Sequence, residues 1–221
     1  MTPPSTDILP PEIQLALAYA SSDYRDALRI FFDLDLRLAR IVAGTNEPML
    51  GQMRLTWWRE TLAKPIDERP NGDAVLEAIG QCWAGREGYL IKLVEGWERL
   101  LAEPPLREDD ALFFLEGRRD TLMAAFDKYA GPEAKHGTYA QPAWWWTCAD
   151  VAANITDDTE RAMFVELGLR HEPIIDRLPK PDRGLAVLGA IAHRALKNGG
   201  RPLMEGRGAS VTAIRAAIFR R

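Results

Sequence analysis

Apolar residues recur along this chain with the period of an α-helix. In the stretch that follows Ser21-Ser22-Asp23 they stand three or four positions apart, a spacing that lines one face of a helix. The positions concerned are Ala27, Ile30, Phe31, Leu34, Leu38, Ile41 and Val42. No stretch alternates apolar and polar residues as a half-buried strand would, and none is rich in β-branched residues. The pattern therefore predicts an all-α fold.

Capping residues, prolines and glycines set the predicted helix boundaries. A helix capped within Ser21–Asp23 is expected to run to about Ala43. The other predicted helices are Ile13–Tyr19, Met49–Ala63, Asp73–Trp83, Gly88–Ala102, Asp109–Ala130, Ala143–Asn154, Asp157–Leu178 with an end or kink at Pro173, Asp182–Lys197 and Ser210–Phe219. Polar stretches at Lys64–Gly72 and Gly131–Pro142 are predicted loops. These loops are short for domain linkers, so we predict a single domain over residues 1–221, with 1–11 as a flexible N-terminal segment.

The composition is that of a globular protein with a sizeable core. The chain has 221 residues, of which 47% are hydrophobic and 27% charged. The formal net charge is -4, so the chain lacks the basic character of a nucleic-acid-binding protein. Basic residues do gather near the end of the sequence, at Arg201, Arg207, Arg215, Arg220 and Arg221. They indicate either a solvated tail or contact with an anionic membrane surface.

The cysteines and the N-terminal sequence indicate the cellular compartment of the protein. Cys82 and Cys148 belong to no Cys-x-x-Cys motif, and both stand in apolar helical surroundings, which favours reduced thiols. The Pro-rich start, residues 1–11, lacks the apolar core of a signal peptide. No window reaches the roughly 18 apolar residues that a spanning helix needs. We expect a cytoplasmic protein, with peripheral membrane contact as an open possibility.

Two consecutive predicted helices carry motifs typical of one enzyme family. The first fits the frame Arg-x-Ala…Tyr-Ala-Phe…Asp-x-x-x-Asp-Gly through Arg25, Ala27, Phe31-Phe32 and Gly44. The second fits Arg-Leu…Trp-Trp-Arg through Arg54-Leu55 and Trp57-Trp58-Arg59. These segments resemble the squalene/phytoene synthase family. The resemblance runs weakly over most of the chain and is most specific in the Trp-Trp-Arg segment.

The resemblance implies an isoprenoid-synthase-like helix bundle around a central cavity. Enzymes of that family ionise a prenyl diphosphate with a Mg²⁺ cluster, which is held by Asp residues on two facing helices. Two Asp four positions apart share one helix face and can hold metal jointly. In this chain the first such pair falls on Ala39 and Ala43, whose methyl groups cannot bind a metal.

The second acidic motif of the family is kept only in part. Its best counterpart is the segment Asp150–Asp158, in which Asn154 replaces an Asp. Asp157 and Asp158 remain as an acidic pair. They are weak candidate ligands for Mg²⁺, since one or two carboxylates would not assemble a cluster.

Other carboxylates are possible substitutes. Glu116 and Asp120 stand four positions apart and form the best alternative acidic face. Arg118 and Arg119 lie beside them in sequence, which favours an ordinary surface ion-pair network instead.

Four residues are candidates for a substrate pocket. Arg54, together with Arg59, could bind a diphosphate, and Arg25 could add positive field. Trp57 and Trp58 could line a prenyl-binding cavity. The alternatives are a solvated position for Arg25, a buried and carboxylate-paired position for Arg54, and ordinary core packing for the two Trp. The three Trp of Trp144–Trp146 cannot share one helix face, so one is expected to point outward or to pack under a loop.

These features lead to one hypothesis and two rivals. The leading hypothesis is a catalytically degenerate family member that acts as a non-enzymatic binding or assembly factor. The resemblance includes such a branch, the phytoene-synthase-like proteins that assist assembly of respiratory complex I. The first rival is an active Mg²⁺-dependent prenyl diphosphate transferase that uses substitute carboxylates. The second is a carrier of a prenyl lipid that needs no metal.

Overall fold

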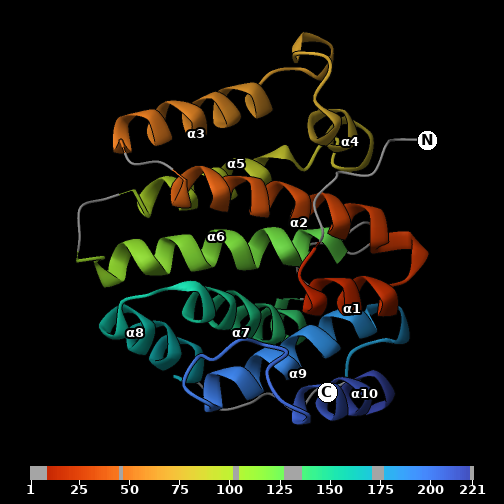
Figure 1. Ribbon diagram of the computed structural model, residues 1–221. Coiled ribbons are helices and arrows are strands. Elements are labelled where there is room, and N and C mark those ends of the chain that lie inside the picture. Colours follow the sequence, from red (N-terminus) through yellow and green to blue (C-terminus); the bar gives the residue numbers. More distant parts are fainter. Residues whose placement is uncertain (1–8, 45–46, 102–104, 127–135, 171–176, 220–221) are drawn as a thin grey trace. The chain divides into compact units, whose positions relative to one another are not determined.

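A computed structural model of the chain describes residues 9–44, 47–101, 105–126, 136–170 and 177–219. Within these ranges there is no strand, so the predicted all-α fold is confirmed (Figure 1). The helices are α1 Pro11–Tyr19, α2 Ser22–Ala43, α3 Pro48–Ala63, α4 Ala74–Cys82, α5 Glu87–Arg99, α6 Glu108–Phe126, α7 His136–Asn154, α8 Asp158–Leu169, α9 Arg183–Lys197 and α10 Gly208–Phe219, with 3-10 turns at Ile66–Glu68 and Lys180–Asp182.

The described residues fall into two compact units. Residues 26–125 belong to the first unit, and residues 9–25 together with 126–219 belong to the second. Of the N-terminal segment predicted to be flexible, residues 1–8 lie outside the described part. Leu9 is buried, and Pro11 is the first residue of α1. The prediction of a single domain stays a prediction.

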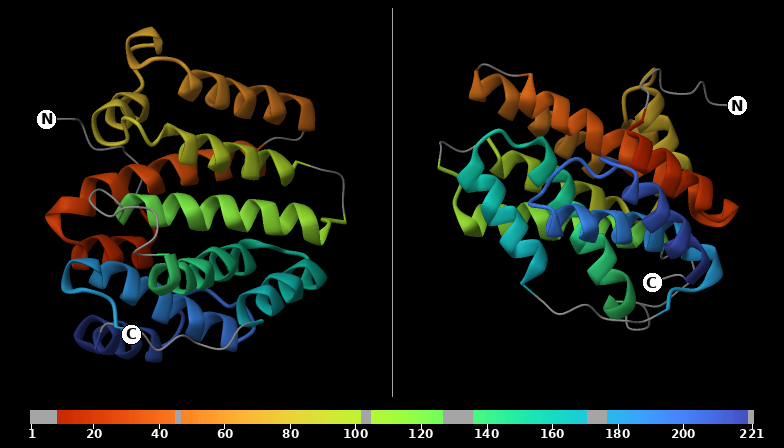
Figure 2. Two further views of the ribbon diagram at one scale, coloured as in Figure 1. Left: turned by 180° about the vertical axis from the view of Figure 1, so that it is seen from behind. Right: turned by 60° about the horizontal axis from the view of Figure 1, so that its bottom comes forward.

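Aromatic side chains fill the core of the first unit. The indole of Trp83 is buried and donates a hydrogen bond from Nε1 to the carbonyl oxygen of Ala27 on α2, over 3.0 Å. Trp97 of α5 packs edge-on against Phe114 of α6, with ring centroids 4.8 Å apart. The two helices approach closely because Gly96 has no side chain. A Cβ there would lie 3.2 Å from the Cα atom of Phe114. Helix α3 packs against α5, as two views show (Figure 2).

Helix α9 is the centre of the second unit. It is buried along most of its length, and α1, α7, α8 and α10 all pack against it (Figure 1). Small residues make these contacts close. A Cβ at Gly189 would lie 2.7 Å from the Cα atom of Pro142 on α7. Backbones that approach this closely leave room only for glycine.

The same contact explains an incorrect prediction. The segment up to Pro142 was expected to be a loop, with a helix beginning at Ala143. Instead α7 begins at His136 and contains Pro142. Proline removes one backbone hydrogen bond and normally interrupts a helix. Here its ring packs against Gly189 of α9, and this packing offsets the local cost. Residues 131–135 of the predicted loop lie outside the described part.

Helix α8 is shorter than predicted. The pattern favoured a helix from Asp157 to Leu178, but α8 ends at Leu169. Pro173, where we expected the end or kink, lies outside the described residues. Leu178 is buried outside any helix. The remaining predicted helices are confirmed within the described residues, with ends that differ by a few residues. Residues 102 and 127–130, which two of the predictions included, lie outside the described part.

Candidate functional site

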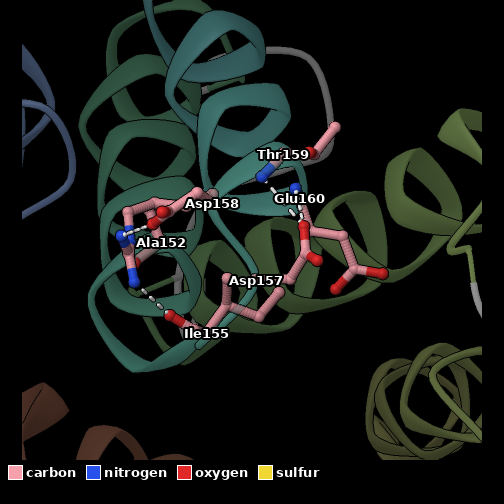
Figure 3. Close-up of polar contacts among 7 residues, drawn as sticks. Ala152, Ile155, Asp157, Asp158, Thr159 and Glu160 are labelled. Atoms are coloured by element: carbon pink, nitrogen blue, oxygen red, sulfur yellow. Dashed lines mark hydrogen bonds and ion pairs between the residues drawn. The ribbon is translucent and has the colours of Figure 1, made fainter.

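The acidic pair Asp157-Asp158 lies at the junction of α7 and α8 (Figure 3). Asp157 is the N-cap of α8. Its Oδ1 atom accepts hydrogen bonds from the backbone N–H groups of Thr159 (2.8 Å) and Glu160 (2.9 Å). An N-cap carboxylate satisfies backbone donors that otherwise lack partners and interacts favourably with the helix dipole. This geometry gives Asp157 a structural role that needs no metal.

Arg161 completes the same junction. Its guanidinium donates to the carbonyl oxygens of Ala152 (3.3 Å) and Ile155 (2.8 Å) near the end of α7. Its Nη1 atom also lies 2.5 Å from Oδ1 of Asp158. Asp158 therefore holds the arginine that caps the preceding helix. The side chain of Asn154 donates to the carbonyl oxygen of Asp150 over 2.8 Å, so it too makes a local contact within α7.

The other candidate metal positions are the first acidic motif and the Glu116–Asp120 face, and the structure forms no carboxylate cluster at their described residues. Ala39 is half-buried and Ala43 exposed, and both are on α2. Asp120 pairs with the neighbouring Arg119 over 2.7 Å. Across the described ranges, no three His, Cys, Asp or Glu side chains gather in a group that could hold a metal ion. The role of Asp157 and Asp158 as weak metal ligands stays a prediction.

Arg25, a candidate for the substrate pocket, caps a helix. Its Nη2 atom donates to the carbonyl oxygen of Ala20 over 2.8 Å, and its Nε atom donates to that of Leu17 over 3.2 Å. Both carbonyls belong to the C-terminal end of α1. A cation at this end of a helix binds unpaired carbonyls and interacts favourably with the helix dipole. The side chain is thus occupied within the second unit.

The two tryptophans of α3 have different environments. Trp58 is buried and lies under the guanidinium of Arg37, which is 5.5 Å from the ring centroid. Trp57 is 42% exposed and meets Trp58 edge-on. Arg54 is exposed on the same helix. The alternative in which Arg54 is buried and paired with a carboxylate is therefore wrong.

Trp57 belongs to an exposed apolar surface that the sequence did not predict. It follows Met53 by four residues, and Met53 follows Met49 by four, so the three share one face of α3. Met49 and Met53 are 76% and 64% exposed, and Leu50 beside them is also exposed. The opposite face of α3 is buried. We call Met49, Leu50, Met53 and Trp57 the α3 face.

Arg59 links α3 to α5. Its Nη1 atom lies 2.8 Å from Oε2 of Glu98. Burial raises the pKa of the Glu98 carboxyl above its ordinary value, although the charge of Arg59 and a hydrogen bond from Thr56 oppose this shift. The arginine of the Trp-Trp-Arg motif therefore holds two packed helices together.

The three consecutive tryptophans of α7 are engaged in packing. Trp146 is fully buried. The Nε1 atom of Trp144 donates to the carbonyl oxygen of Leu167 over 3.0 Å. Trp145 stacks on His193, with centroids 4.2 Å apart and planes inclined by 11°. Trp144 and Trp145 are half-buried, so the strongly exposed apolar side chains lie elsewhere, on the α3 face among others.

A buried ion pair in the first unit was also missed. Arg118 of α6 and Asp35 of α2 are each 2% exposed and form two hydrogen bonds, with Nε–Oδ1 at 3.0 Å and Nη2–Oδ2 at 2.5 Å. Trp97 of α5 donates to the same Oδ1 over 2.9 Å. The prediction of a surface network for Arg118 was wrong, since this arginine is buried and pairs with Asp35, which accepts hydrogen bonds from both α5 and α6.

The second unit has a buried polar pair of its own. The hydroxyl of Tyr139 on α7 donates to Oδ2 of Asp182, which directly precedes α9. Both side chains are buried. Burial raises the pKa of the Tyr139 hydroxyl, and the hydrogen bond to Asp182 raises it further. The phenol therefore stays protonated and acts as a structural donor.

Comparison of the chain with protein-family models, with curated proteins and with solved structures finds no match in any of the three.

Proposed function

We propose that this protein is a catalytically degenerate, squalene/phytoene synthase-like factor that acts by binding rather than by catalysis. The proposal includes an isoprenoid-synthase-like arrangement of the helices around a central cavity. The observation that carries it is the state of the two acidic motifs. The first has Ala39 and Ala43 in place of carboxylates, and the acidic pair of the second stabilises the α7–α8 junction.

The chemistry of the family explains why this matters. Departure of pyrophosphate from a prenyl diphosphate leaves an allylic cation and a highly charged leaving group. Mg²⁺ ions neutralise that charge, and they need several oxygen ligands. In this chain one carboxylate of the acidic pair caps α8 and the other holds the arginine that caps α7, so both already have local partners. We therefore favour binding of a partner over turnover of a substrate.

The α3 face supports a protein as that partner. Methionine adapts its shape to different surfaces and is common at binding sites. Both signs of charge border the face, because Arg54 follows Leu50 by four residues and Glu60 follows Trp57 by three, and both are exposed. Mixed charges around an apolar centre are typical of protein interfaces. By its resemblance, the partner we propose is an assembly intermediate of respiratory complex I.

We propose the cytoplasm as the location. Neither of the chain's two cysteines, Cys82 and Cys148, forms a disulfide, and reduced thiols are usual there. In the described part of the chain, no helix is long and apolar enough to cross a membrane.

Calorimetric titration with farnesyl diphosphate tests the enzymatic rival. Titrations with and without Mg²⁺ are paired with an assay for released pyrophosphate. We expect no Mg²⁺-dependent heat and no pyrophosphate. Mg²⁺-dependent binding with pyrophosphate release would establish an active prenyltransferase instead. Binding that ignores Mg²⁺ and gives no product would favour a prenyl-lipid carrier. The variant Ala39→Asp with Ala43→Asp extends the test, since new turnover in it would locate the lost function in the first acidic motif.

A deletion strain of the source organism tests the binding role. Native gels report the content of assembled complex I, which we expect to fall on deletion and to recover with the wild-type chain. The double variant Met53→Ser with Trp57→Ser should not restore it. The control Asp158→Asn, which changes an exposed residue of the second unit, should restore it. Normal complex I in the deletion strain would rule out this role.

A further inference from the structure

Helix α10 has its small residues inside and its large apolar residues outside. Its buried side chains are all alanine, at Ala209, Ala213, Ala216 and Ala217. The exposed side includes Val211 (58% exposed), Ile214 (54%), Ile218 (64%) and Phe219 (45%). Val211, Ile214 and Ile218 stand three and four positions apart, so they form one stripe along the helix. A surface helix normally has the reverse arrangement.

The charged residues of the segment 206–221 all have one sign. Arg215 is exposed and follows Val211 by four residues, so it borders the stripe. The segment 206–221 contains Arg207, Arg215, Arg220 and Arg221 and has no Asp or Glu. Arg177 adds a further cation at the end of α10, where its Nε atom donates to the carbonyl oxygen of Phe219 over 3.0 Å. The segment therefore attracts anions, and the exposed Glu205 directly before it is paired with Arg201 over 3.4 Å.

A shallow pocket of about 270 Å³ adjoins the stripe. It is lined by Ala190 of α9 and by Thr212, Arg215, Ala216 and Phe219 of α10. A guanidinium and a hydroxyl thus meet apolar walls in one place. The volume lies just below the roughly 300–1,000 Å³ of typical small-molecule sites. A pocket of this size and composition suits the anionic headgroup of an amphiphile rather than a whole lipid.

From these observations we infer that α10 binds the surface of an anionic phospholipid bilayer. The stripe of Val211, Ile214 and Ile218 enters the boundary between headgroups and acyl chains, while Arg215 contacts lipid phosphate. The alanine side of α10 is buried in the protein, so only the exposed side offers the apolar and basic groups with which helices lie in the plane of a membrane. The 12 residues of α10 span only about 18 Å, too short to cross the bilayer.

The charge pattern favours an anionic bilayer over a second copy of the chain or a protein partner at α10. A second copy of the chain would bring a second cationic α10 against the first, and like charges repel. The α3 face has charges of both signs at its border, whereas α10 has arginine alone. The inference does not depend on the role proposed for the α3 face, because the two surfaces belong to different units.

Vesicle co-sedimentation of the full chain tests the inference. Vesicles of phosphatidylcholine alone are compared with vesicles that also contain phosphatidylserine, at low and at high salt. We expect binding only to the anionic vesicles and weaker binding as salt rises. Arg215→Gln should weaken it roughly fivefold, the usual effect of one basic residue at such a surface. Ile214→Ser with Ile218→Ser should weaken it at least about tenfold.

Met53→Ser on the α3 face is the matched control, because it makes the same kind of change at an exposed residue of another helix. It should bind vesicles like the wild type. Thermal unfolding by circular dichroism checks that each variant is folded. The inference is overturned by absence of binding, by equal binding to neutral vesicles, or by binding that the α10 variants leave unchanged. It is also overturned if sedimentation velocity detects self-association that Ile214→Ser with Ile218→Ser abolishes.

Discussion

Asp35 and Arg118, separated by 83 positions in the sequence, form a bidentate ion pair in the core of the first unit. The carboxylate also accepts a hydrogen bond from Trp97, and the guanidinium lies 5.5 Å from the centroid of that indole ring. Removing two charges from water is costly, and only good geometry with further hydrogen bonds offsets the cost. This pair meets both conditions, and it joins α2, α5 and α6.

Breaking the pair should therefore destabilise the protein strongly. Asp35→Asn leaves a buried guanidinium without its counter-charge, so we expect the free energy of unfolding to fall by about 3–5 kcal/mol. Urea denaturation followed by circular dichroism measures it. Asp120→Asn is the control, since the partly exposed pair with Arg119 should contribute no more than about 1 kcal/mol.

A double variant tests whether the unpaired buried charge causes this loss of stability. Asp35→Leu with Arg118→Met replaces both charges by apolar groups and leaves no ion unpaired. It should be more stable than either single variant. If the double variant lost as much stability as the two single changes added together, the unpaired charge would not be the cause.

The sequence contained a signal for this pair. Asp35 follows Leu28 and Phe31 at core spacing, and Arg118 does the same after Ala111 and Phe114. Two opposite charges at core positions of two helices predict an internal pair. We instead assigned Arg118 to the surface, because neighbouring charges in the sequence suggested a solvated network. Local spacing identifies which positions are buried, but it does not identify which buried positions meet.

The α7–α8 junction gave a similar signal. Asp157 followed by Glu160 three positions later is a capping pattern, and the structure places Asp157 at the N-cap of α8. The family resemblance drew attention to metal binding instead. The helices themselves were predictable, because the period of apolar residues determines them. The beginning of α7 was not, since α7 contains Pro142, a residue that normally interrupts a helix.

The close approach of Gly189 to Pro142 predicts the effect of adding a side chain there. Gly189→Ala adds a Cβ within 2.7 Å of the Cα atom of Pro142, so α7 and α9 must separate. We expect a loss of about 1–3 kcal/mol in the free energy of unfolding. Gly88→Ala on α5 is the matched control. A Cβ there meets nothing within 4 Å, and the change should stabilise the protein by about 0.5–1 kcal/mol. Equal effects of the two substitutions would contradict close packing at Gly189.

His193 should make stability depend on pH. Burial lowers the pKa of its imidazole below the ordinary value of 6.5, and the charge of Lys197 adds to the shift. As the pH falls, the imidazole of His193 therefore becomes protonated in the unfolded chain before it does so in the folded protein. The contribution of His193 to stability is fully present above pH 6.5 and is lost as the pH falls toward the folded-state pKa.

Unfolding experiments on either side of pH 6.5 test this dependence. His193→Phe keeps a ring stacked on Trp145 but removes the titrating group, so its stability should vary less over this interval. Lys197→Met should raise the pKa of His193, which an NMR titration of the imidazole reports directly. An unchanged pH dependence in His193→Phe would assign the effect to other groups.

Substitutions of Asp157 distinguish its role as a helix cap from a role as a metal ligand. As an N-cap, Asp157 should contribute about 1 kcal/mol through its bonds to the backbone of Thr159 and Glu160. Asp157→Ala should therefore lower the melting temperature, and Asp157→Ser, which keeps an accepting oxygen, should recover most of the loss. Neither result should depend on Mg²⁺. A metal that binds only the folded state would raise the melting temperature of the wild type as its concentration increases. Such a rise, absent in Asp157→Ser, would make Asp157 a metal ligand and would weaken the case against catalysis.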